Sequence, residues 1–140
     1  MIRHVFFDTN ILLDVLTERQ PFFEDAALLW TMAEKRQIEG IVSAMSLPTA
    51  YYLLRRVVGH RKAITGIKAV RSIFEIVTLD HHMIDQAIDA DYSDLEDGIQ
   101  ACAALRAGAD CIVTRDPKGF RKSDVPVLAP ETLIASLNIE

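Results

Sequence analysis

The sequence predicts an α/β protein in which a parallel sheet is flanked by helices. Short β-branched or aromatic runs alternate with longer segments of helical period, and this alternation is typical of successive β-α units. The chain has 140 residues, half of them apolar, which is enough to bury a core without disulfides or a structural metal. Because no repeat, low-complexity tract or long linker divides the chain, we expect one domain over residues 1–140.

The first part of the chain predicts two complete β-α steps. A strand is expected at His4–Phe7, and Asn10 is a suitable cap for a helix over residues 11–17. Pro21 is expected to open a second helix, because apolar residues then recur at spacings of three and four. A second strand is expected at residues 41–43.

The rest of the chain continues the same alternation, and glycines at 59 and 108 mark helix ends. We expect helices at 46–58, 60–74, 82–90 and 94–107, strands at 75–79, 111–114 and 127–128, and a last helix from Pro130.

Charge is distributed unevenly along the chain. The net charge of −5 excludes a generally basic protein that coats nucleic acid by bulk electrostatics. Residues 41–74 contain six Lys and Arg and no acid, whereas residues 75–97 contain eight acids and no Lys or Arg. The basic part is therefore a candidate anion-binding surface, and two solvated helices of opposite sign are the simpler alternative.

The two cysteines and the N-terminus predict a protein of the cytoplasm. Cys102 and Cys111 lie in apolar surroundings and lack His or Cys partners at zinc spacing, so we expect reduced thiols. The longest uncharged stretch, residues 41–54, is too short to span a bilayer and contains Pro48. No signal peptide or membrane segment is expected.

Two aspartates follow predicted strands. Asp8 comes directly after the first strand, and Asp116 lies two residues beyond the strand at 111–114. A single aspartate in this place is often only a turn former, but ligands of open α/β sheets bind beyond the carboxyl ends of strands. If Asp97 joins them, a cation must offset the mutual repulsion, and carboxylates without convergent His or Cys favour Mg²⁺ over zinc.

The acidic run at residues 93–97 has both a structural and a chemical interpretation. Ser93 and Glu96 have the spacing of a capping box, which gives Glu96 a structural role. Asp94 and Asp97 are three residues apart and share one face of the predicted helix. The cap accounts for one of the acids and not for all three.

Three segments resemble the motifs of PIN domains. Phe6-Phe7-Asp8-Thr9-Asn10 is similar to the opening motif, Asp-Leu-Glu-Asp-Gly-Ile-Gln at 94–100 to the central acidic motif, and Ile-Val-Thr-Arg-Asp-Pro-Lys-Gly-Phe at 112–120 to the C-terminal motif. The resemblance covers essentially the whole chain, whose length matches the toxin ribonucleases of VapBC type II toxin-antitoxin pairs. It implies a Rossmann-like PIN fold with a central parallel sheet of about four to five strands. It also implies an endoribonuclease that depends on Mg²⁺ or Mn²⁺, a homodimer and a small antitoxin partner.

The resemblance assigns roles to individual positions. Asp8, Asp97 and Asp116 correspond to the metal-site acids, and Thr9, Asn10 and Thr114 to the groups that orient them. PIN nucleases usually carry a Glu near the start of the helix after the second strand, and this chain has Thr49 there. Residues 41–74 contain no acid, so either Asp94 or Glu96 supplies the missing charge or the metal is held more weakly.

The leading functional hypothesis is a metal-dependent phosphodiesterase that cleaves single-stranded or looped RNA, in which the metal activates water and stabilises charge on the phosphate. Basic residues are expected to bind the RNA backbone, although each is equally well explained as a solvated surface residue: Arg55, Arg56, Arg115, Lys118, Arg121 and Lys122.

Two other functions remain open. The absence of the usual Glu at Thr49 favours a catalytically weak or silent PIN-like module that binds RNA or a protein. An aspartyl-phosphate phosphatase of the haloacid dehalogenase type also has an Asp after its first strand. That chemistry needs a second carboxylate two residues later, where this chain has Asn10.

The helix over residues 47–58 predicts how the protein assembles. Its apolar side chains, with Tyr51, Tyr52, Leu54 and Val58 among them, exceed what one small core requires. We expect a symmetric dimer through this helix, and the alternative is that all these side chains are core.

Overall fold

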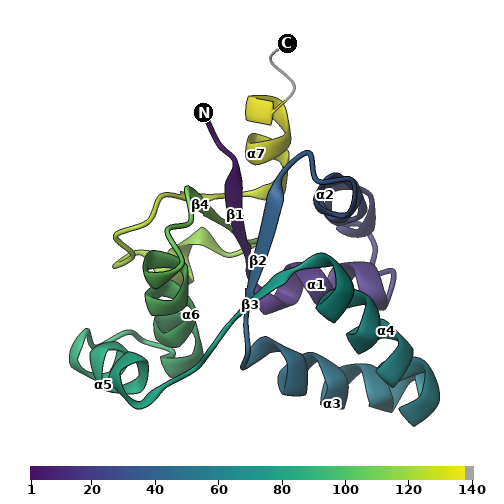
Figure 1. Cartoon of the computed structure of the whole chain (residues 1–140), viewed down its shortest axis with the longest axis horizontal. Coiled ribbons are helices and arrows are strands. Elements are labelled where there is room, and N and C mark those ends of the chain that lie inside the picture. The colour runs from purple at the N-terminus through teal and green to yellow at the C-terminus, as the bar shows by residue number, and fades with distance from the viewer. Residues whose placement is uncertain (138–140) are drawn as a thin grey trace.

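Strands and helices alternate along the computed structural model, which describes residues 1–137 (Figure 1). The strands are β1 (His4–Phe7), β2 (Glu39–Ser43), β3 (Glu75–Val77), β4 (Cys111–Val113) and β5 (Val127–Leu128). The helices are α1 (Thr9–Leu16), α2 (Phe23–Glu34), α3 (Ser46–Val58), α4 (His60–Ile73), α5 (His81–Asp89), α6 (Leu95–Arg106) and α7 (Pro130–Leu137), and a 3₁₀ helix, η1, covers Pro117–Phe120.

The five strands form one parallel sheet in the order β3-β2-β1-β4-β5. The chain moves from β1 to β2 and β3 on one side, and then returns to place β4 on the other side of β1. The direction of winding therefore changes between β1 and β4. In open α/β sheets, the carboxyl ends of the strands at such a point form the usual ligand site.

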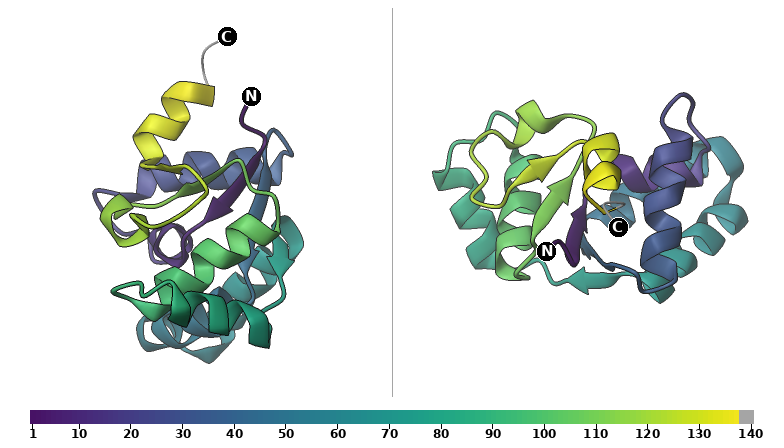
Figure 2. Two further views of the ribbon diagram at one scale, coloured as in Figure 1. Left: turned by 90° about the vertical axis from the view of Figure 1, so that its left-hand side faces the viewer. Right: turned by 90° about the horizontal axis from the view of Figure 1, so that it is seen from above.

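Both faces of the sheet are buried, and alternate residues of each strand enter different cores. Val5 and Phe7 pack on one face beneath α1, α2, α4 and α7, whereas Phe6 packs on the other with α5, α6 and η1. Figure 2 shows the helices on both sides of the sheet. This double burial explains why the strands read as continuous apolar runs in the sequence.

All five predicted strands are present, whereas both helix starts predicted between the first and second strands are wrong. Asn10 does not cap α1, because the backbone carbonyl of Asp8 already accepts from the N–H of Ile11 at 2.9 Å and the helix begins at Thr9. Pro21 does not open α2. A turn closed by the Phe22 N–H and the Arg19 carbonyl comes first, and α2 starts at Phe23.

The thiols agree with the expectation of reduced cysteines. Cys111 is buried in β4, and burial raises its pKa to about 12. Cys102 is partly exposed on α6, and neither residue forms a disulfide. Within residues 1–137, no helix is both long and apolar enough to cross a membrane.

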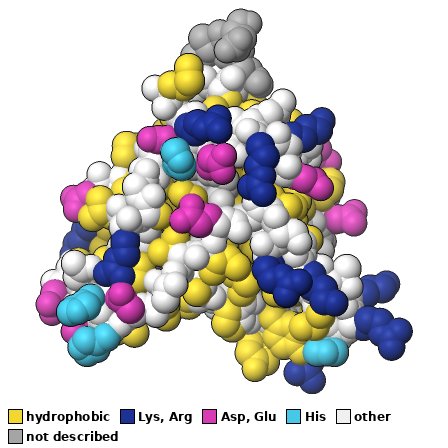
Figure 3. Space-filling view, viewed as in Figure 1, with side chains coloured by type: hydrophobic (Ala, Val, Ile, Leu, Met, Phe, Trp, Pro, Cys, Tyr) yellow, Lys and Arg dark blue, Asp and Glu magenta, His cyan; other side chains and the backbone are white. Residues whose placement is uncertain are grey.

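The basic and acidic parts of the sequence, residues 41–74 and 75–97, also lie in different parts of the folded molecule. Figure 3 shows Lys and Arg side chains gathered near α3 and α4, away from the end of the molecule that α5 and α6 occupy. The same view shows apolar side chains along the edge where α3 lies.

Candidate active site

Asp8 lies at the carboxyl end of β1 and is buried, with 4% of its surface exposed. Its Oδ1 accepts from Nε2 of Gln100 at 3.0 Å, and its Oδ2 accepts from Oγ1 of Thr114 at 2.7 Å. Burial raises the pKa of Asp8, and these two hydrogen bonds and the N–H groups of Asn10 and Thr9 oppose the rise. The carboxylate is thus fixed in orientation.

Thr114 joins Asp8 to the second predicted acid. Its hydroxyl is fully buried, donates to Asp8 and accepts from the backbone N–H of Asp116 at 3.0 Å. This contact sets the backbone of the loop that leads from β4 into η1, so that Asp116 follows the strand next to β1. Thr114 therefore contacts both residues, and the orienting role expected for it stays a prediction.

Asp97 is the third residue of α6. Asp94 caps this helix, and its Oδ1 accepts from the backbone N–H of Asp97 at 3.1 Å. Burial raises the pKa of Asp97 to about 7, and the negative charges of Asp94, Asp8, Asp116 and Glu96 add to the rise in that order. The fold therefore places Asp97 where its anion is disfavoured.

Gly119 in η1 shows how close the Asp97 and Asp116 carboxylates come. A Cβ atom on Gly119 would lie 2.6 Å from Oδ2 of Asp97 and 3.4 Å from Oδ2 of Asp116. Both oxygens therefore face one point on the backbone of η1, and a side chain there would collide with Asp97. Residues from α6 and from the β4–η1 segment meet at the same edge of the sheet.

Buried polar side chains that the sequence analysis did not select support Asp8. The Oε1 atom of Gln100 accepts from the backbone N–H of Thr9 at 3.1 Å, and the Thr9 hydroxyl bonds to that of Ser46 at 2.7 Å. Thr9 thus contacts Gln100, which in turn donates to Asp8, and the orienting role expected for Thr9 stays a prediction. The sequence feature that could have identified Gln100 is its position three residues after Asp97 on an Ala-rich helix, because this spacing places the two side chains on one helix face. Asn10 is exposed, and its side chain forms no hydrogen bond with residues 1–137.

The predicted capping box is wrong. Asp94 caps α6 instead of Ser93, and the Glu96 side chain accepts a hydrogen bond from Oγ1 of Thr49 at 3.1 Å. Ser93 and Asp94 both suit an N-cap, so the true register differed by one residue from the predicted one. The position where PIN nucleases usually carry a Glu therefore contacts a Glu from α6.

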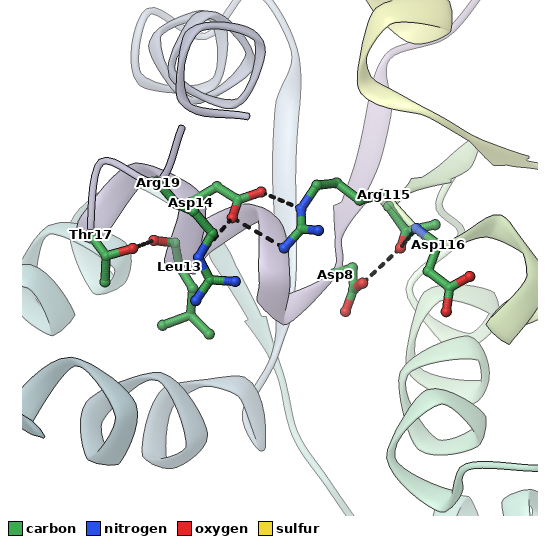
Figure 4. Close-up of polar contacts among 8 residues, drawn as sticks. Asp8, Leu13, Asp14, Thr17, Arg19, Arg115 and Asp116 are labelled. Atoms are coloured by element: carbon green, nitrogen blue, oxygen red, sulfur yellow. Dashed lines mark hydrogen bonds and ion pairs between the residues drawn. The ribbon is translucent and has the colours of Figure 1, made fainter. Parts of the chain in front are cut away.

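Arg115 points away from the predicted metal acids. Its Nε and Nη2 atoms donate to the two carboxylate oxygens of Asp14 at 2.6 and 3.3 Å, and Asp14 is fully buried on α1. Figure 4 shows the Arg115 side chain directed to Asp14 while Asp116 points the other way. The guanidinium also lies 4.0 Å from the ring centre of Phe22. Arg115 was expected to be an exposed side chain that contacts RNA. In the structure, its side chain instead connects α1 with the loop between β4 and η1.

The other basic residues expected to bind RNA are exposed: Arg55 and Arg56 on α3, Lys118 in η1, and Arg121 and Lys122 after it. Lys122 is anchored, because its Nζ donates to the backbone carbonyls of Ala90 and Asp91 at 3.1 and 2.6 Å. Lys118 and Arg121 form no ion pair with an acid of the described chain.

The donor set at this edge suits a hard divalent cation. Within residues 1–137, no three His, Cys, Asp or Glu side chains are already at metal-binding separation, so ligation would need these side chains to move. The donors available are carboxylate oxygens, and burial, followed by repulsion from the neighbouring acids, raises the pKa of Asp97. A cation between Asp8, Asp97 and Asp116 would remove this repulsion, and oxygen donors are those that Mg²⁺ and Mn²⁺ prefer.

Solved structures share this fold. The chain aligns with DNA-bound VapBC from Salmonella typhimurium with a TM-score of 0.70, 14% identity and coverage of 93% of this chain and 99% of that one. It aligns with FitAcB from Neisseria gonorrhoeae with a TM-score of 0.67, 18% identity and coverage of 91% and 98%. For VapC20 of Mycobacterium tuberculosis, a sarcin-ricin loop cleaving toxin, the TM-score is 0.64, with 18% identity and coverage of 77% and 86%.

Sequence comparison leads to the same group of proteins. Ribonuclease VapC1 of Aquifex aeolicus (strain VF5) is 29% identical over 132 residues, which cover 91% of this chain and 90% of that protein. The family model of the PIN domain matches residues 4–118. This segment includes Asp8, Asp97 and Asp116, and the chain therefore belongs to the PIN-domain family.

Proposed function

We propose that the protein is an endoribonuclease that requires Mg²⁺ or Mn²⁺ and cleaves single-stranded or looped RNA. One observation carries the proposal: Asp8, Asp97 and Asp116 gather at the carboxyl edge of the sheet, beside the point where the winding changes. The relative named Ribonuclease VapC1 and the solved toxin that cleaves the sarcin-ricin loop support a nuclease acting on RNA.

Asp8, Asp97 and Asp116 are the residues that would hold the cation. When bound, it supplies positive charge to the scissile phosphate and lowers the pKa of a water molecule, so that no protein nucleophile is needed. Gln100 and Thr114 hold the Asp8 carboxylate in one orientation, which limits the reorganisation needed for binding. Burial and the neighbouring acids raise the pKa of Asp97 to about 7, and a bound cation would favour the ionised form of this carboxyl.

The test compares the wild type with Asp97→Asn on single-stranded RNA of varied sequence, with Mg²⁺, with Mn²⁺ and with EDTA. We expect the wild type to cleave internally with either metal and to be silent in EDTA. The variant should lose most of this activity, because it lacks one anionic ligand. Cleavage that persists in EDTA, or that survives equally in the variant, contradicts the proposal.

We also propose that the protein is the toxin of a cytoplasmic toxin-antitoxin pair with a small antitoxin. The support is that solved structures of the same fold include VapBC and FitAB assemblies. The test is co-expression with the product of a neighbouring small reading frame. A stable complex with suppressed RNA cleavage is expected, and unchanged cleavage in the presence of that product argues against the pairing.

Thr49 is the observation that favours a second function, a catalytically weak PIN-like module that binds RNA or protein. The residue places a hydroxyl where a carboxylate is usual, and this hydroxyl donates to Glu96. Thr49→Glu separates the two functions. A variant that gains strong metal-dependent cleavage from a silent wild type identifies the natural protein as a binding module.

A further inference from the structure

A cavity of about 510 Å³ lies between the segment that joins α5 to α6 and the segment that contains η1. It is lined by Tyr92 and Ser93 on one side and by Lys118, Gly119, Arg121 and Lys122 on the other. Its volume falls within the range of ligand pockets, roughly 300–1,000 Å³. Asp8, Asp97 and Asp116 are not among the residues that line this cavity.

The cavity adjoins the acidic site through Gly119. This glycine lines the cavity, and its backbone also lies directly against the carboxylate of Asp97. Gly119 therefore belongs both to the cavity lining and to the surroundings of the Asp97 carboxylate, and no side chain at this position separates the two.

The cavity wall contains positive charge that the protein leaves unpaired. Lys118 and Arg121 are exposed and form no ion pair with any acid of residues 1–137, although the chain as a whole carries a net charge of −5. Lys122 differs from them, because its amine is bonded to the carbonyls of Ala90 and Asp91 and closes the wall. Asp91 also lines the cavity, but its carboxylate would repel a phosphate. The groups in the lining that are available to a phosphate are therefore Lys118 and Arg121.

Tyr92 provides an aromatic surface in the same cavity. Its ring is partly buried against α6, since a Cβ atom on Gly98 would lie 3.0 Å from Cδ1 of the ring. Gly98 is the residue after Asp97, so this packing fixes the ring beside the acidic site. Aromatic side chains next to cations are the usual platform for an unpaired base with its backbone.

We propose that this cavity binds the nucleotide next to the scissile phosphate of a single-stranded RNA, with its phosphate on Lys118 and Arg121 and its base on the ring of Tyr92. The inference rests on the proposed nuclease function and adds to it a subsite for the strand. It means that affinity for RNA depends on residues that touch neither the metal acids nor the cleaved bond.

The experiment measures binding apart from cleavage. A labelled single-stranded RNA of about ten nucleotides is titrated with wild type and variants in EDTA, by fluorescence anisotropy. The same proteins are assayed for cleavage with Mg²⁺ to obtain kcat and KM. Lys35→Gln is the matched control, because Lys35 is an exposed cation at the C-terminal end of α2, outside the cavity.

Tyr92→Leu should raise Kd and KM about 10-fold with little change in kcat, whereas Tyr92→Phe should stay within about 2-fold of the wild type, because the ring is kept. Lys118→Gln and Arg121→Gln should each weaken binding and reduce the slope of log Kd against log salt by about 0.7. Lys35→Gln should change neither quantity. Thermal unfolding of Tyr92→Leu checks that the loss of the Gly98 contact leaves the fold intact.

The possible results separate the subsite from the nuclease function. If the wild type cleaves RNA and the cavity variants match Lys35→Gln in Kd, KM and salt slope, the subsite is wrong and the nuclease function stands. If the wild type binds RNA without cleaving it, and Tyr92→Leu and Lys118→Gln weaken binding, the subsite stands and the nuclease function fails. A wild type that neither binds nor cleaves RNA overturns both.

Discussion

The Asp97 carboxylate makes the protein less stable whenever it is ionised in the absence of a cation. Its folded-state pKa of about 7 is above its ordinary value, so the stability associated with this group is fully present below about pH 4 and is lost as pH rises to about 7. Asp97→Asn removes this loss. We expect the variant to exceed the wild type in Tm by on the order of 3 °C at pH 7, with the difference vanishing near pH 4.

Glu96→Gln is the control for this prediction. Glu96 lies one residue away and accepts from the Thr49 hydroxyl, and a glutamine oxygen can accept the same hydrogen bond. The change should therefore cost little stability and little RNA cleavage. A metal titration adds a second readout: Mg²⁺ should raise the Tm of the wild type and of Glu96→Gln more than that of Asp97→Asn. Equal responses in all three proteins would remove Asp97 from the metal site.

The hydroxyl of Thr114 is the second side chain whose removal has a defined consequence. It donates to Asp8 and accepts from the Asp116 N–H, so Thr114→Val removes a hydrogen bond from the buried Asp8 carboxylate and one from the partly exposed Asp116 N–H. We expect about a 10-fold fall in kcat, and a loss of about 1–3 kcal/mol in the free energy of unfolding. Thr114→Ser keeps the hydroxyl and should recover most of the activity. The Ser variant being as inactive as the Val variant would argue for packing instead of hydrogen bonding.

The connection between α1 and the β4–η1 loop depends on one buried ion pair. Asp14 is fully buried, and Arg115 supplies both of its close charged hydrogen bonds, whereas Arg19 remains 3.9 Å away. Arg115→Gln should therefore cost about 3–5 kcal/mol of unfolding free energy, because it leaves a buried carboxylate without its partner.

The double variant with Asp14→Asn and Arg115→Gln tests the physical reason. Without the buried charge, it should be more stable in urea denaturation than Arg115→Gln alone. Arg19→Gln, which changes a half-exposed partner, should have a much smaller effect. If the double variant is no more stable than Arg115→Gln, the buried charge of Asp14 is not the cause of the loss.

Local patterns predicted the strands well and the helix starts less well. The five strands are short apolar runs, and both faces of the sheet that they form are covered. No helical periodicity therefore competes with the strand interpretation of these segments. At the helix starts, Asp8 and Asn10, and then Ser93 and Asp94, are neighbouring residues that all suit an N-cap. The choice between them depends on tertiary contacts such as that of Glu96 with Thr49.

The acids of the site were predictable because each follows a strand or begins a helix within a recognisable motif. Thr114, which contacts Asp8, was also selected from its motif, but Gln100 and the pair of Arg115 with Asp14 were not. Gln100 contacts Asp8 across 92 positions of the chain, and Arg115 reaches Asp14 across 101 positions. Such pairs leave no periodic signal in one sequence, and Arg115, with Lys118, Arg121 and Lys122 after it, looked like part of an open basic loop.

Across the whole molecule, the topology separates the acids from most of the positive charge. The change in winding between β1 and β4 brings Asp8 and Asp116 together, and α6 adds Asp97 from the side of the sheet that η1 also covers. The cations of α3 and α4 lie on helices that carry none of these three acids. The basic residues that follow Asp116 in the chain are Lys118 in η1 and Arg121 and Lys122 after it.

The exposed face of α3 leads to the prediction about assembly. Leu54 is core, as the alternative to a dimer required, but Tyr52, Leu53 and Val57 are exposed by 59%, 42% and 68%. Figure 3 shows apolar side chains along this edge, bordered by Lys and Arg. An apolar centre with a charged rim is the usual composition of a symmetric interface, so we expect a dimer at about tens of micromolar protein.

The variant Val57→Glu should convert this dimer to a monomer in sedimentation equilibrium, because two carboxylates would face each other near the two-fold axis. The control Arg71→Glu changes an exposed residue of α4 by a larger charge and should leave the dimer intact. A wild type that sediments as a monomer would contradict the prediction.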